Sequence, residues 1–331
     1  MQPSKGTVLI TGVAGFVAFH LSHDLLEKGY SVWGVDSFND YYDVRMKEKR
    51  IEILSQNKNF SYERLNFANY ADLFAKAKDK KIEMIIHLGA QAGVLYSLVN
   101  PWAYEESNIK GTLSIFELAR HLNIKKVFYA SSASVYGGNT KLPFEESDPT
   151  DQPLSLYAVS KKTNELLAKT YHSTFSLRMV GLRFFNLYGT YGRPDMAFFQ
   201  FSRAILSDSP ITLRGGNTMK RNFTHISDCI RAINGIIEKD TYTCDVYNIG
   251  GSQVVPVPEA VALLEKYLGK KAKINNTPKL QGEIEVAYAS TKKLTDETGY
   301  TPKMTIEQGL QEYATWFLEN KDWLLSLKEF K

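Results

Sequence analysis

A tyrosine and a lysine four residues apart, Tyr157 and Lys161, open a predicted helix that runs from Leu156 to about His172. Side chains with this spacing lie on one face of a helix, and a lysine ammonium beside a phenol lowers the pKa of the phenol. Tyr157 is therefore a candidate base at neutral pH, and Lys161 is a candidate contact for a cofactor ribose. Leu166 and Leu167 are expected on the buried side of the helix.

Serine hydroxyls follow one of the predicted strands. The run Val127–Ala130 leads into Ser131, Ser132 and Ser134. The carboxyl edge of an open α/β sheet is where such folds bind their ligands. We expect one of these hydroxyls to bridge a substrate oxygen and the Tyr157 phenol.

A glycine turn, Gly12–Ala18, joins the predicted strand Val8–Thr11 to an amphipathic helix. Gly12 permits a tight turn, and Gly15 lets the backbone approach a pyrophosphate that the helix N-terminus binds through its amides. Asp36 ends the next predicted strand, where a carboxylate hydrogen-bonds the adenosine ribose and repels a 2′-phosphate. In this context the glycine pattern predicts a dinucleotide site that prefers NAD to NADP.

Short strands alternate with amphipathic helices in the first half of the chain. The strand-like runs are Val8–Thr11, Val32–Val35, Met84–Leu88, Val127–Ala130 and Val180–Phe184. This alternation predicts an α/β fold, a Rossmann-like doubly wound parallel sheet with a smaller C-terminal substrate-binding lobe. We expect residues 1–182, with 224–253 returning through a strand at Tyr247–Ile249, to form the NAD-binding domain. Residues 183–223 and 254–331 would then form the nucleotide-sugar-binding lobe.

Composition and charge limit the possible partners. The 331 residues include 40 Lys and Arg against 36 Asp and Glu, a spread-out excess that does not predict nucleic-acid binding. Two cysteines exclude a disulfide framework and a zinc ribbon, and no metal site is expected. The chain has no apolar run of membrane-spanning length and begins without the apolar stretch of a signal peptide. We expect a cytoplasmic protein without nucleic-acid or membrane partners.

With these motifs the chain resembles, over nearly its whole length, an extended short-chain dehydrogenase/reductase of the NAD-dependent epimerase/dehydratase family. Several segments resemble its UDP-glucuronate 4-epimerase branch, namely Asp36–Tyr42, Gln91–Val94, Ser107–Thr112 and Gly192–Ala197. The resemblance implies NAD as cofactor, a UDP-sugar as substrate and a homodimer formed by the helices around Ile109–Leu122 and Leu156–His172.

The resemblance also assigns residues to the site. The implied catalytic residues are Ser132, Tyr157 and Lys161. The implied cofactor contacts are Gly12, Ala14, Gly15, Phe16, Val17, Asp36, Asn39, Asn66, Phe67, Leu88, Ala90, Gln91, Asn108, Tyr157 and Lys161. The implied substrate contacts are Gly93, Ser134, Asn186, Arg193 and Arg221, with Asn186 and Arg221 on the diphosphate and Arg193 at the sugar carboxylate.

The resemblance implies interconversion of UDP-glucuronate and UDP-galacturonate by transient C4 oxidation, rotation of the 4-keto sugar and return of the hydride. Leu95 stands where the branch usually has Arg, and Asn186 where it usually has Thr. These two residues favour the alternative of a UDP-glucose or UDP-N-acetylglucosamine 4-epimerase. Ser134 stands where decarboxylases and dehydratases of the family carry Glu, which disfavours a UDP-glucuronate decarboxylase. A non-catalytic nucleotide-sugar-binding regulator is the alternative from another class.

Overall fold

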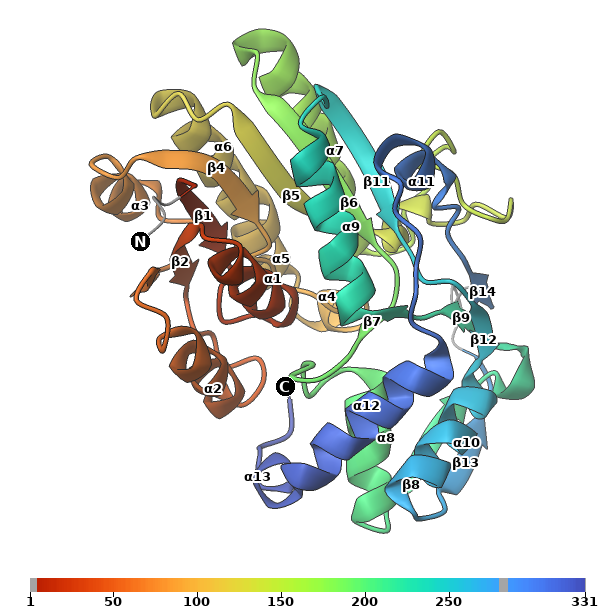
Figure 1. Ribbon diagram of the computed structural model, residues 1–331. Coiled ribbons are helices and arrows are strands. Elements are labelled where there is room, and N and C mark those ends of the chain that lie inside the picture. The colour runs from red at the N-terminus through yellow and green to blue at the C-terminus, as the bar shows by residue number, and fades with distance from the viewer. Residues whose placement is uncertain (1–4, 280–284, 331) are drawn as a thin grey trace.

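A parallel sheet of seven strands lies at the centre of the protein, in the order β11-β6-β5-β4-β1-β2-β3 (Figure 1). The computed structural model describes residues 5–279 and 285–330, so residues 1–4, 280–284 and 331 of the expected domain ranges lie outside the described residues. The strands are β1 (Thr7–Thr11), β2 (Ser31–Asp36), β3 (Phe60–Arg64), β4 (Ile82–His87), β5 (Lys126–Ser132), β6 (Arg178–Phe184) and β11 (Cys244–Ile249). The strand order reverses between β1 and β4, which is the place where doubly wound sheets bind their ligands. The predicted α/β, Rossmann-like fold is confirmed.

Helices cover both faces of this sheet. The helices on one face are α1 (Phe16–Glu27), α9 (Ile226–Lys239) and α11 (Lys292–Thr298); those on the other are α3 (Tyr70–Ala77), α6 (Gly111–His121) and α7 (Leu156–Phe175). Alternate residues of β1 join the two cores: Val8 and Ile10 pack toward α1 and α9, and Leu9 packs toward α6 and α7. This burial on both faces explains why the strands read as continuous apolar runs.

β3 has no apolar run that predicts it. It forms the edge of the sheet beside β2, and only two of its five residues are even half-buried. Tyr62 in its middle keeps 43% of its surface exposed. An exposed edge strand needs few apolar residues, and its sequence pattern is correspondingly weak.

The face of α7 that turns inward is largely polar. Leu166 is 52% exposed, so the prediction that it lies on the buried side is wrong, whereas Leu167 is partly buried. Lys161, Asn164 and Glu165 occupy the inner face of the helix instead, next to the ends of the sheet strands. Because polar side chains occupy the inner face of α7, the apolar side chain of Leu166 lies on its outer face.

A second, smaller core lies below the sheet in Figure 1. It is built by helices α8 (Ala197–Leu206), α10 (Val257–Leu268), α12 (Ile306–Glu319) and α13 (Lys321–Leu325). Three small sheets pair β7 (Leu187–Tyr188) with β10 (Thr224–His225), β8 (Pro210–Arg214) with β13 (Lys273–Thr277), and β9 (Lys220–Asn222) with β12 (Val254–Pro256) and β14 (Val286–Ala287). Met46 from α2 (Val44–Leu54) also packs into this core, so α2 links the two parts of the chain.

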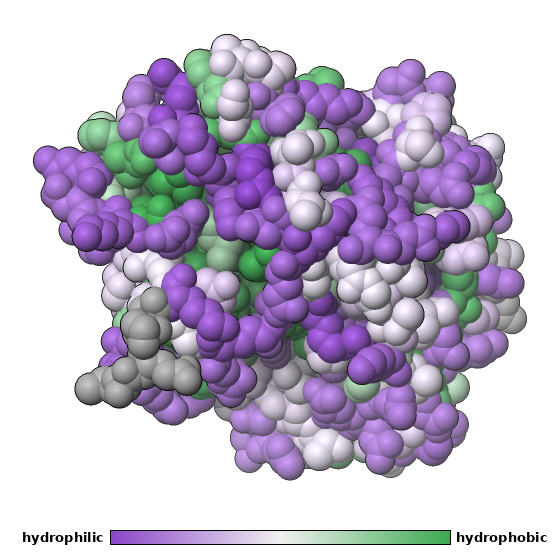
Figure 2. Space-filling view, turned by 45° about the horizontal axis from the view of Figure 1, so that its top comes forward, coloured by the Kyte–Doolittle hydropathy of each residue, from purple (hydrophilic) through white to green (hydrophobic). Residues whose placement is uncertain are grey.

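Hydrophilic residues dominate the face drawn in Figure 2, and its apolar residues gather in small patches between them. None of the helices in residues 5–279 and 285–330 has the length and apolarity needed to cross a membrane.

Candidate functional site

A cavity of about 390 Å³ lies at the carboxyl ends of β1, β4 and β5, against the residues that follow β6. Most of the residues predicted for the site line it: Gly12, Gly15, Phe16, Val17, Asp36, Asn39, Phe67, Leu88, Ala90, Gln91, Gly93, Ser132, Tyr157, Lys161, Asn186 and Arg193. They come from both halves of the chain, so the fold brings the glycine turn, the serine strand and the Tyr–Lys helix to one place.

Five predicted residues do not line this cavity: Ala14, Asn66, Asn108, Ser134 and Arg221. The Ala14 amide donates to Asp36, and the Ser134 hydroxyl donates to Ser132. Asn108 lies in a π-helix (Glu105–Lys110) and bonds the Gln91 backbone through both its amide oxygen and its amide nitrogen. These three residues therefore support groups that do line the cavity.

Asn66 and Arg221 have other neighbours. The Asn66 side chain accepts from the Ala68 amide and donates to Glu106. The Arg221 guanidinium, on β9, donates to the backbone oxygens of Lys220 and Glu285. Their contacts with cofactor and diphosphate stay predictions.

The glycine turn brings two backbone segments together at the end of β1. Gly12 has φ +67°, and a Cβ on it would lie 2.6 Å from the Cα of Gly89. Helix α1 begins directly afterwards at Phe16, without a side-chain cap and without an acidic residue in its first turn. Its first amides are consequently available to an anion.

Asp36 occupies the end of β2 beside this turn. It is buried, and its carboxylate accepts hydrogen bonds from the amides of Phe38, at 2.7 Å, and Ala14, at 3.2 Å. The backbone thus fixes the carboxylate at the wall of the cavity. A glycine cradle, uncapped helix amides and a fixed carboxylate together fit a dinucleotide with its diphosphate at α1 and a ribose at Asp36.

Tyr157 and Lys161 lie in the first two turns of α7, which Ser155 caps by accepting from the Ala158 amide. The Lys161 ammonium donates to the backbone oxygen of Ala130 at 3.0 Å and lies 5.9 Å from the centre of the Tyr157 ring. Ser132 faces Tyr157 from the end of β5 and accepts from the Ser134 hydroxyl at 2.7 Å. The three predicted catalytic residues therefore meet in one place.

The electrostatics of Tyr157 differ from the sequence-based expectation. Burial raises the pKa of Tyr157, while the hydrogen bond with Ser132 and the charge of Arg193 oppose that rise. Burial also lowers the pKa of Lys161 to about 7. The prediction that Lys161 makes the phenol acidic is therefore wrong, because desolvation of both side chains dominates.

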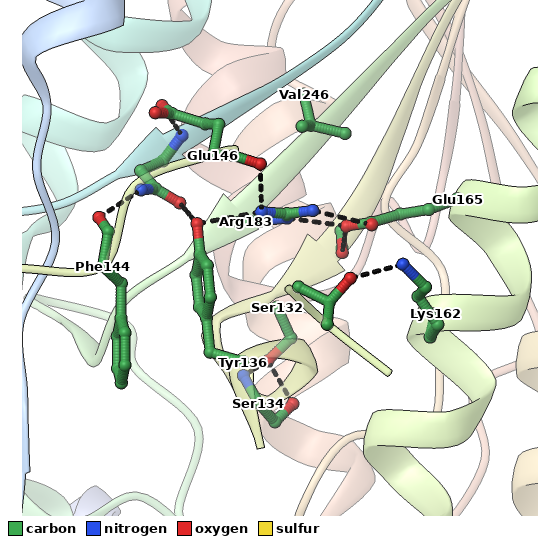
Figure 3. A network of polar contacts seen from close by, with 12 residues as sticks. Ser132, Ser134, Tyr136, Phe144, Glu146, Lys162, Glu165, Arg183 and Val246 are labelled. Carbon is green, nitrogen blue, oxygen red and sulfur yellow. Dashed lines mark hydrogen bonds and ion pairs between the residues drawn. The ribbon is translucent and has the colours of Figure 1, made fainter. Parts of the chain in front are cut away.

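A buried ion pair lies behind the serine strand (Figure 3). The Glu165 carboxylate accepts from both Nε and Nη2 of Arg183, at 2.8 and 2.9 Å, and also from the Ser131 hydroxyl at 2.7 Å. Arg183 reaches the other way to the Tyr136 hydroxyl at 2.9 Å, and Tyr136 donates to Asn248 at 2.6 Å. The network joins α7, which holds Tyr157, to β5, which holds Ser132, and to β6 and β11.

Arg193 lines this cavity and also a neighbouring cavity of about 210 Å³. Asn186 and Met196 are shared by both cavities as well. The remaining wall of the smaller cavity is mostly aromatic, formed by Tyr188, Phe198, Phe199, Phe223 and Tyr313. The two adjoining cavities suit a ligand with a flat apolar ring at one end and polar groups at the other.

Two cations on α2 were not predicted. Lys47 lines the main cavity, donates to the Asn39 backbone and side-chain oxygens and lies 4.0 Å from the Asp36 carboxylate. Burial lowers the pKa of Lys47 to about 8. Arg50 is completely buried, and its guanidinium bonds the backbone oxygens of Ala14 and Tyr191.

No carboxylate among the described residues pairs with Arg50, so neutral oxygens alone satisfy its charge. Arg50 thereby ties the glycine turn to the segment that precedes Arg193. The spacing of Lys47 and Arg50, three apart on one helix face, was the available sequence signal. Because Arg45–Arg50 contains four cations, this pattern is easily taken for a solvated surface.

The comparisons with known proteins agree with this geometry. The model of the NAD dependent epimerase/dehydratase family matches residues 8–250. An uncharacterized protein of Methanocaldococcus jannaschii is 50% identical over 322 residues, covering 97% of this chain and 98% of its own. The UDP-glucuronate 4-epimerase of Thermodesulfobacterium geofontis is 37% identical, covering 98% and 99%. The structure of UDP-glucuronic acid 4-epimerase from Bacillus cereus with UDP-glucuronic acid and NAD is similar at a TM-score of 0.87 and 32% identity, covering 95% and 99%.

Proposed function

Because the chain belongs to the NAD-dependent epimerase/dehydratase family, NAD is its cofactor, and we propose that it interconverts UDP-glucuronate and UDP-galacturonate as a 4-epimerase. The observation that supports this substrate most directly is Arg193, a guanidinium that lines the cavity together with Tyr157 and Ser132. Its charge reaches Tyr157, whose pKa it lowers against the larger effect of burial. An arginine beside the reacting group suits a sugar that brings a carboxylate.

The proposed reaction divides the work between cofactor and protein. NAD, when bound, supplies a hydride acceptor, a hydride donor once reduced, and a positively charged ring in its oxidised form. A positive charge near Tyr157 lowers its pKa, as Arg193 already does, and so opposes the burial that keeps the phenol protonated. Tyr157 then takes the proton of the sugar C4 hydroxyl and returns it after the 4-keto sugar has turned over. Ser132 orients the same oxygen through its hydroxyl, and Lys161 holds the cofactor ribose.

The nucleotide has to stay anchored while the sugar turns. We propose that the uracil ring packs against the aromatic wall of the smaller cavity, in which Phe198 and Phe223 contact each other with ring centres 4.7 Å apart. Asn186, which lines both cavities, then lies beside the diphosphate. This division of contacts supports firm binding of UDP and leaves the sugar loosely held.

Of the two departures from the uronate pattern, Asn186 lines both cavities, whereas Leu95 carries little weight in the structure. Leu95 is 45% exposed and does not line the cavity, so the residue at this position has no direct part in the wall facing the sugar. Ser134 bonds Ser132 and has no carboxyl group to promote loss of CO₂ or water. The position of Leu95 removes one argument for a neutral hexose, and Ser134 favours epimerisation over decarboxylation and dehydration.

The purified protein should convert UDP-glucuronate to UDP-galacturonate without added cofactor or with NAD alone. Separate incubations with UDP-glucose and UDP-N-acetylglucosamine, resolved by anion-exchange chromatography, should give far less product. Conversion of UDP-glucose at the higher kcat/KM would replace the proposed substrate with a neutral hexose. Release of CO₂ would identify a decarboxylase, and failure to convert any of these sugars would leave only nucleotide-sugar binding.

Replacing Asp36 by Asn should lower the affinity for NAD about tenfold, because the ribose hydroxyls lose a charged acceptor. The loss of the charge also removes its repulsion of a 2′-phosphate, so the ratio of NADP to NAD affinity should rise. Fluorescence titration with NADH and NADPH measures both effects. The exposed α3 variant Asp72→Asn is the matched control; equal losses of NADH and NADPH affinity in Asp36→Asn would contradict the assignment.

We further propose that residues 1–182 and 224–253 bind NAD and that 183–223 and 254–331 bind the nucleotide sugar. β11, which lies in the returning segment, completes the edge of the sheet beside β6. Two copies would associate through the outer faces of α6 and α7. Leu113 and Leu166 are exposed there, and the face continues over α5 (Pro101–Tyr104), where Trp102 is 77% exposed. Exposed apolar faces of this kind are typical of protein–protein interfaces, and a second copy would shield this one from water.

Changing Leu166 to Asp should convert the dimer to a monomer, because a carboxylate would be buried at the centre of the apolar contact. Light scattering coupled to size-exclusion chromatography measures the mass directly. Val17 and other cavity residues are untouched, so NAD binding should persist. A wild-type mass of one chain at micromolar concentration would contradict the proposed dimer.

A further inference from the structure

Arg193 enters the cavity as one half of an ion pair. Its Nε and Nη2 donate to the two carboxylate oxygens of Asp195 at 2.8 and 2.7 Å. Asp195 is almost completely buried and lines neither of the two cavities to which Arg193 belongs. The carboxylate therefore stands behind the guanidinium, on the side away from the ligand.

The pair leaves a defined part of Arg193 facing the cavity. The Nη1 group has no hydrogen-bond partner among the described residues, whereas the Nε–Nη2 edge is fully occupied. Burial disfavours the charge of Arg193, but Asp195 more than offsets this and keeps its pKa raised. Tyr41, a neighbour of the pair, has its pKa raised to about 12 by burial and then by Asp195. A ligand carboxylate would thus meet a guanidinium whose charge is already balanced.

We propose that Asp195 is a positioning residue that weakens the hold of Arg193 on the sugar carboxylate, so that the oxidised sugar can turn over within the site. This inference rests on the proposed function, because only a uronate brings a carboxylate to Arg193. Asp195 occupies one edge of the guanidinium and neutralises its charge, which leaves the sugar a weaker contact at the Nη1 end.

The physical reason lies in the need to bind one substrate in two orientations. A guanidinium without a protein partner in a buried site binds a carboxylate strongly and in a fixed plane. Such a contact stabilises the bound ground state and has to break before the sugar ring can rotate about its diphosphate linkage. Binding energy of this kind lowers KM without raising kcat. A balanced Arg193 avoids that penalty.

The test compares Asp195→Asn and Asp195→Ser with the wild-type enzyme, using UDP-glucuronate as substrate and UDP-glucose as competitive inhibitor. The two nucleotide sugars share the diphosphate, so a general change in the field of the site affects both. With the carboxylate charge removed, the KM for UDP-glucuronate relative to the Ki of UDP-glucose should fall about tenfold, and kcat should fall by a similar factor. A residue needed only for folding would not lower KM.

The surface variant Asp240→Asn serves as control. Asp240 pairs with Arg178 at the far end of β6, and its left-handed backbone conformation is one that Asn accepts. A rise in the KM for UDP-glucuronate at unchanged kcat would show instead that Asp195 merely holds Arg193 in place. Unchanged KM and kcat would show that Asp195 neither weakens the contact of Arg193 with the sugar nor positions Arg193. Either result would overturn the proposal. Asp195 is replaced by both Asn and Ser because the test needs only one of the two variants to fold. Wild-type turnover of UDP-glucuronate, measured in the same series, tests the proposed function separately.

Discussion

Replacing Tyr157 by Phe should lower turnover of UDP-glucuronate by about a thousandfold, which is the usual contribution of a positioned general base. Phe keeps the ring, so the edge-to-face contact with Tyr104, 6.0 Å between ring centres, persists in the variant. Only the hydroxyl that faces Ser132 is lost. We expect NAD and UDP to make most of their contacts with other parts of the cavity wall, so their affinities should remain within about twofold of the wild-type values.

Turnover is followed by chromatography of the sugar products, and binding by calorimetry with UDP on the NAD-loaded protein. Tyr171→Phe is the matched control, because Tyr171 lies on the same helix and its hydroxyl bonds Glu117 rather than a cavity residue. Turnover in Tyr157→Phe close to that of Tyr171→Phe would remove Tyr157 from its proposed role. Loss of UDP binding in Tyr157→Phe would instead indicate damage to the site as a whole.

The parts of the site that local sequence can predict are those built on one strand, turn or helix. Gly12 is recognisable because a glycine turn between a strand and a helix is typical of a dinucleotide site. Asp36 is recognisable because it stands at the end of the next strand, where such sites place an acidic residue. Tyr157 and Lys161 share a helix face by spacing alone. The alternation of strands and helices permits few arrangements of a sheet, and for this reason the parallel, doubly wound sheet could be predicted.

The missed features depend on contacts between distant segments. Lys47 and Arg50 read as surface cations, and only the fold buries them beside the glycine turn. The pKa of Tyr157 was mispredicted for the same reason, because its desolvation comes from packing that no local pattern encodes. Leu166 was placed inside since an apolar residue on a helix is usually buried. Here Glu165 takes the inner position, held by a partner 18 residues away on β6.

That partnership leads to the second large effect. Replacing Glu165 by Ala should lower the free energy of unfolding by about 3–5 kcal/mol, because Arg183 is left buried without a counter-charge. Both side chains are only 4% exposed, so water cannot replace the lost carboxylate easily. The Ser131 hydroxyl loses its acceptor at the same time. Chemical denaturation measures the loss of stability. The kcat for UDP-glucuronate measures the effect of the lost Ser131 hydrogen bond on the site.

The double variant Glu165→Met/Arg183→Met separates stability from positioning. Two apolar side chains of similar length remove both charges together, and such replacements of buried pairs are often neutral or stabilising. We therefore expect the double variant to recover most of the stability lost in Glu165→Ala. Its kcat should stay about tenfold below the wild-type value, because nothing then fixes Ser131 to α7 and the Ser132 hydroxyl is less well placed against Tyr157. Wild-type kcat in a stable double variant would show that the network supports the fold alone.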